Sequence, residues 1–101
     1  MGPSLGFGAV AYHLAQLPGD AMLALSFGDK GEPKIAALWY KRALNVPGLD
    51  PETILALRYD LGISLEMAGD SDEALDCFRQ VYAMNIDYRD VSDRIATLQH
   101  H

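Results

Sequence analysis

Few residues of this 101-residue chain are of the types that carry out chemistry. Cys77 stands beside Phe78 in an apolar helical pattern, and nothing near it in the sequence would lower the pKa of its thiol. His13 is isolated in an apolar segment, with no Cys or His at the spacing of metal ligands. We therefore expect a structural or partly exposed thiol at Cys77 and no metal site.

The acidic residues and the glycines have structural explanations as well. Asp70, Asp72 and Glu73 stand at an expected helix start, where carboxylates cap the first turn and interact favourably with the helix dipole. The glycines fall at expected helix ends and turns rather than in a phosphate-binding loop. The sequence thus predicts no catalytic constellation and no cofactor, and we expect a protein that is not an enzyme.

Composition and charge limit the class of protein and partner. Half of the residues are hydrophobic and 22% are charged, which is typical of one small folded domain. The net charge of −6 disfavours nucleic acid and anionic membranes as partners, because both require a basic face. A single cysteine permits no internal disulfide, and the N-terminal segment lacks the features of a signal peptide or membrane span. These features predict a cytoplasmic location, whether the chain is whole or part of a longer protein.

Helix start and stop signals divide the chain into short helices. Asp50, Pro51 and Glu52 form a helix start, with an acidic cap followed by proline in the first turn. Apolar residues then recur at helical spacing until Gly69, a residue suited to ending a helix. Asp70 is expected to cap a second helix that ends near Asn85. Pro33 opens a similar helix that is predicted to run to about Asn45.

The two halves of the chain repeat each other at a constant offset of 38 residues. The matched pairs are Leu23 and Leu61, Ala24 and Gly62, Phe27 and Leu65, Gly31 and Gly69, Ala36 and Ala74, Tyr40 and Phe78, and Ala43 and Val81. Small residues at Ala24, Gly62 and Ala96 would let helices approach closely. Tyr40 and Phe78 would fill the space between the layers.

The pattern predicts an all-α domain over residues 4–99 with about six helices. Its expected parts are an N-terminal helix over 4–16, a first repeat over 20–45, a second repeat over 50–85 and a last helix within 87–99, from Tyr88 to Gln99. Four extra residues in the first repeat are assigned to the loop at 45–49, which is read as a spacer or as an edge that projects from the array.

The residues Leu61, Gly62, Leu65, Gly69, Ala74 and Phe78 resemble the tetratricopeptide repeat, whose signature extends over about 34 residues. The first repeat is similar to it, and Ile95-Ala96 supplies a partial third match. Arg58, Val81 and Ile86 depart from the family pattern. The resemblance implies a right-handed array of helical hairpins, an α-solenoid, that binds peptides or partner proteins on its concave surface.

Carried over from the family, the concave groove is lined by the first helix of each repeat. We expect Tyr59 and Glu66 to be exposed there. The apolar members are open to two interpretations, as groove or as core. Together the expected groove residues are Met22, Leu25, Asp29, Tyr59, Asp60, Ile63, Glu66 and Met67, with Ala56, Asp93 and Thr97 beside them.

The groove chemistry favours an apolar or basic protein segment as partner. Family members that grip a carboxylate tail use cations at inner positions, which here carry Ala21, Leu25, Tyr59 and Ile63. A carboxylate would find no charged donor there, so tail binding of that kind is not expected. The alternative function is a structural or oligomerising module that self-associates through the apolar N-terminal helix at 4–16.

Overall fold

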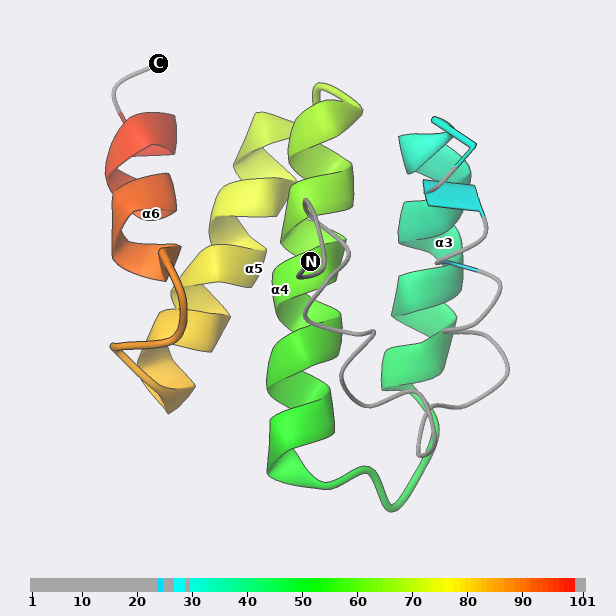
Figure 1. Ribbon diagram of the computed structural model, residues 1–101, viewed down its shortest axis with the longest axis horizontal. Coiled ribbons are helices and arrows are strands. Elements are labelled where there is room, and N and C mark those ends of the chain that lie inside the picture. Colours follow the sequence, from blue (N-terminus) through cyan, green and yellow to red (C-terminus); the bar gives the residue numbers. More distant parts are fainter. Residues whose placement is uncertain (1–23, 25–26, 29, 100–101) are drawn as a thin grey trace, which may run out of the picture.

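The computed structural model describes residues 24, 27–28 and 30–99, and within them it contains helices and no strands (Figure 1). The helices are α3 (Pro33–Leu44), α4 (Pro51–Met67), α5 (Ser71–Met84) and α6 (Val91–Gln99). Each packs against the next along the chain, so that α4 lies between α3 and α5, and α5 contacts α6. The predicted all-α class is confirmed. The helix expected over 4–16 lies outside the described residues.

The start of α4 follows the sequence signals closely. Pro51 occupies the first turn, where its missing N–H removes no helical hydrogen bond. The N–H of Thr53 donates to the Asp50 carboxylate at 3.0 Å, so Asp50 caps the helix. Asp70 also precedes its helix, but its side chain accepts no capping hydrogen bond. The expectation that Asp70 acts as a side-chain cap is therefore wrong.

Two turns in the repeated halves are bonded in the same way. Gly69 has φ of +90°, its N–H donates to the Glu66 carbonyl at 3.1 Å, and the N–H of Asp70 donates to the Leu65 carbonyl at 2.9 Å. Gly31, at φ of +77°, has the equivalent pair of bonds to residues 27 and 28, each at 3.0 Å. This glycine-ended motif satisfies the last carbonyls of a helix. The predicted helix ends near Gly31 and at Gly69 are confirmed.

Gly62 sets how closely α4 approaches α5. A Cβ at this position would lie 2.8 Å from Cε1 and Cζ of Phe78, closer than carbon atoms can pack. Phe78 is fully buried, as are Ala74 and Val81 on the same helix. The prediction that Gly62 is a packing residue opposite Phe78 is confirmed.

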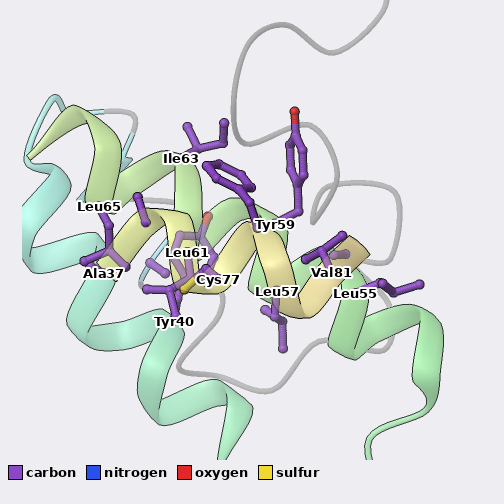
Figure 2. Close-up of a cluster of buried hydrophobic side chains, with 14 of the residues drawn as sticks. Ala37, Tyr40, Leu55, Leu57, Tyr59, Leu61, Ile63, Leu65, Cys77 and Val81 are labelled. Atoms are coloured by element: carbon purple, nitrogen blue, oxygen red, sulfur yellow. The ribbon is translucent and has the colours of Figure 1, made fainter. Parts of the chain in front are cut away.

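The core is built around α4, which is buried on nearly every side. Figure 2 shows the core cluster, with Tyr40 from α3, Leu57, Leu61 and Leu65 from α4, and Val81 from α5. The repeated small and aromatic residues of α3 are buried as predicted, since Ala36, Tyr40 and Ala43 are all 0% exposed. Burying each large apolar side chain contributes on the order of 1.5–3 kcal/mol.

The last helix is shorter than the sequence predicts. It begins at Val91 instead of Tyr88, because Arg89 has φ of +46° and cannot belong to a right-handed helix. The N–H of Tyr88 donates to the Asn85 carbonyl at 3.1 Å, which closes a turn in place of helix. Ala96 is exposed, unlike Gly62 and Ala24 at the matching positions, and no described helix packs on it.

Candidate interaction surface

The structure divides the predicted groove into a buried part and an open part. Tyr59, Asp60 and Ile63 lie in the interior, at 3%, 0% and 4% exposed. Glu66 is half-buried, and Met67 is 59% exposed. The remaining predicted groove residues Met22, Leu25 and Asp29 lie outside the described residues. The open part of the predicted groove is therefore the C-terminal turn of α4.

Tyr59 is enclosed, contrary to the expectation that it would be exposed. Its ring meets Phe78 edge-on at a centroid distance of 5.7 Å and Tyr88 at 5.6 Å. Its hydroxyl donates to the Asp90 carboxylate. An aromatic ring with both an apolar body and a satisfied polar tip is well suited to the joint between two packed elements. Tyr59 thus connects α4 to the turn before α6.

Arg94 of α6 completes this joint with three polar contacts. Its Nε donates to the Tyr59 hydroxyl at 3.1 Å and to the Asp90 carboxylate at 3.2 Å, while its Nη1 donates to Glu66 at 3.1 Å. The guanidinium carbon also lies 5.8 Å from the centre of the Tyr59 ring. We call these four residues, Tyr59, Glu66, Asp90 and Arg94, the α4–α6 joint.

The joint changes the proton affinity of its members. Burial raises the pKa of Tyr59, and the hydrogen bond to Asp90 raises it further. Burial acts against ionisation of Asp90, but the hydrogen bond from Tyr59 and the charge of Arg94 outweigh it, so the pKa of Asp90 is lowered. Asp90 is consequently a carboxylate at neutral pH, as its bonds to Arg94 require.

A surface hollow of about 230 Å³ lies at the joint. Its lining residues are Glu66, Asp90, Asp93, Arg94 and Thr97. Three of these carry carboxylates, whereas Arg94 alone carries a positive charge, and its guanidinium already bonds two of the carboxylates. The sequence carry-over placed Glu66, Asp93 and Thr97 on one surface, and the structure brings them together. The hollow is therefore acidic, with exposed Met67 adjacent to Glu66 in α4.

Asp90 and Arg94 were missed at the sequence level. Their spacing of four residues is a signal for an ion pair on a helix. What the spacing does not reveal is that both side chains also reach α4, since Tyr59 and Glu66 precede Arg94 by 35 and 28 residues. The contact depends on how α6 packs.

Cys77 lies away from this surface and is 7% exposed. Burial, with a smaller contribution from the Glu73 carboxylate, raises the pKa of its thiol to about 11. A thiol with so high a pKa supplies little thiolate at neutral pH. Among the described residues, no group of three or more His, Cys, Asp or Glu side chains is arranged to hold a metal ion.

Comparison of the chain with models of known protein families, with characterised proteins and with solved structures gives no match. None of the helices in the described part of the chain has both the length and the apolar character needed to cross a membrane.

Proposed function

We propose that this chain is a tetratricopeptide-type interaction module that binds an apolar or basic segment of a partner protein. The module would be a right-handed solenoid of about six helices, with α4 and α6 as neighbouring first helices of their repeats. Binding would take place on the side of α4 and α6 that carries Met67 and the acidic hollow.

Three local features support the repeat architecture. The turns at Gly31 and Gly69 share the same hydrogen bonds at an offset of 38 residues. Gly62 receives the Phe78 ring, as a small residue in the first helix of a hairpin would. Five of the matched residues in the second helices, Ala36, Tyr40, Ala43, Ala74 and Phe78, are all 0% exposed.

The acidic hollow beside Met67 is the observation that carries the choice of partner. Asp93 adds a carboxylate to the hollow beyond the two that bond Arg94. An ammonium or guanidinium group would therefore meet an excess of negative charge, while an anionic segment would be repelled. Met67, at 59% exposed, offers an adaptable apolar contact for a side chain next to that cation.

A binding selection with two variants tests this function. A displayed library of random peptides is selected on the wild-type domain, and the enriched peptides are measured by isothermal titration. We expect enrichment of peptides that combine a basic with an apolar residue. The double variant Met67→Ala, Asp93→Lys should weaken their binding at least tenfold, because it removes the apolar contact and reverses one charge of the hollow.

Leu38→Ala is the matched control, because Leu38 is exposed to the same degree as Met67, at 60%, but belongs to α3. Binding should survive this change. If the enriched peptides bind the double variant as well as the wild type, the groove hypothesis fails. Self-association through residues 4–16 then becomes the leading explanation of the apolar surface.

A further inference from the structure

The turn between α5 and α6 is closed without the residues that normally close such turns. Three other described residues with positive φ are glycines, at positions 31, 48 and 69, whereas here the position is filled by Arg89 at +46°. The sequence contains no glycine or proline after Gly69. A side chain at Cβ makes the left-handed conformation unfavourable, so the closed turn holds Arg89 under strain.

Few contacts hold α6 in its place at the end of the row of helices (Figure 1). Its buried residues are Val91 and Leu98, and Ile95 packs partly against the core. The other contacts are the polar bonds of the α4–α6 joint, made by Asp90 and Arg94. The turn that connects α5 to α6 is itself exposed from Asn85 to Asp87.

The surface under α6 is specific for the sequence of α6. It requires an arginine that reaches both Tyr59 and Glu66 of α4. It also requires aliphatic side chains three residues before, one after and four after that arginine, which are the positions of Val91, Ile95 and Leu98. A second copy of this chain supplies this pattern with full complementarity.

We propose that α6 is exchanged between two copies of this chain, giving a dimer in which the turn at residues 85–89 is opened. In this dimer, Asp90 to Gln99 of one copy occupies the surface of α4 and α5 in the other. The joint and the buried contacts of α6 are then remade between copies, and the strain at Arg89 is released. This exchange does not rest on the proposed function.

The first test changes only the turn, at the exposed residue Arg89. Arg89→Gly accepts the positive φ and should lower the dimer association constant at least about fivefold. Arg89→Pro fixes φ near −65°, cannot close the turn and should raise the dimer fraction. Size-exclusion chromatography with light scattering, over a range of protein concentrations, measures both. Wild type that remains monomeric together with Arg89→Pro overturns the proposal.

The second test uses charge reversal to detect the exchange itself. Arg94→Glu and Glu66→Arg each place like charges across the joint when α6 docks on its own chain. Mixed together, the two variants should form a one-to-one dimer, because each exchanged α6 then meets an opposite charge. The chain carrying both changes is the control and should dimerise no more than wild type, since its own joint is restored. A dimer that forms equally well from either single variant alone contradicts the exchange.

Discussion

At the scale of single residues, Gly62 shows a conflict between helix propensity and packing that packing decides. Glycine inside a helix costs about 1 kcal/mol relative to alanine. The fully buried Phe78 ring leaves no room for even one methyl group at this site. The close approach of α4 and α5 therefore depends on a residue that is unfavourable within α4 itself.

We expect Gly62→Ala to lower the free energy of unfolding by about 1 kcal/mol, because overpacking costs more than the gain in helix propensity. Urea unfolding followed by circular dichroism measures the change. Adding Phe78→Leu to Gly62→Ala should cost less than the two single changes summed, since the smaller side chain makes room for the methyl group. An increase in stability with Gly62→Ala would show that the ring moves aside.

Cys77 predicts a pH dependence of stability above neutral pH. Its pKa is raised from 9.0 to about 11 in the folded state, so the folded state favours the protonated thiol. This contribution is fully present below pH 9 and is lost as the pH rises through about 11. The Cys77→Ala variant lacks it, and the stability difference between wild type and variant should narrow by up to about 2 kcal/mol over that interval.

The measurement is urea unfolding of both proteins at several pH values between 7 and 11. Comparison with the variant cancels the ionisation of Tyr59 and Tyr88, whose pKa values burial also raises. A stability difference that stays constant with pH would show that the thiol is solvated in the folded state.

At the scale of helices, α4 and α5 begin with the same residue type in two different roles. Asp50 accepts a hydrogen bond from the Thr53 N–H at 3.0 Å, while the Asp70 side chain makes no capping bond. Both carboxylates also lie at the positive end of a helix dipole. The comparison separates the capping bond from the effect of charge alone.

Asp50→Ala should lower the free energy of unfolding by about 1 kcal/mol, since it removes the cap of α4. Asp70→Ala is the matched control, and its effect should be within about 0.5 kcal/mol, because it removes only the charge. Thermal unfolding of both variants under the same conditions gives the comparison. Equal losses would indicate that charge, and not the hydrogen bond, stabilises these helix starts.

The helix limits show what local sequence can specify. The end of α4 at Gly69 and its start at Asp50-Pro51 follow from residues within one turn of each boundary. The start of α6 was predicted three residues too early, because no glycine or proline marks the turn at Arg89. That turn is held by contacts of Tyr88 and Asp90 with Tyr59, which local sequence does not encode.

At the scale of the whole molecule, burial is distributed unevenly over the helices. Eleven residues of α4 are buried, whereas α6 has two buried residues, Val91 and Leu98. Helices that bury little apolar surface open at a lower free energy than the rest of a domain. The structure therefore predicts that stability falls from α4 towards α6.

Hydrogen exchange followed by NMR should show the slowest amide exchange in α4 and the fastest helical exchange in α6. Arg94→Met should accelerate exchange in α6 further and leave α4 nearly unchanged, because it removes the bonds to Tyr59 and Glu66. Equal protection in α4 and α6 would show that the described helices open as one unit.

The candidate surface could be predicted only in part at this scale. Glu66 and Met67 lie on the surface that the repeat pattern indicated, and Asp93 and Thr97 join Glu66 around one hollow. Tyr59 was placed wrongly, because its burial depends on Tyr88, Asp90 and Arg94, which come from elements later in the chain. Helical periodicity identifies a face of α4 but not which later element covers it.

The central position of α4 has a consequence for synthesis of the chain on the ribosome. Residues 51–67 emerge before α5, which supplies Phe78 and Val81 to cover them. Until Met84 has left the exit tunnel, the nascent α4 displays apolar residues that have no partner on that side. A growing chain in this condition is a target for chaperones that bind exposed hydrophobic segments. Slow translation just after Met84 would give α4 and α5 time to pair before α6 appears.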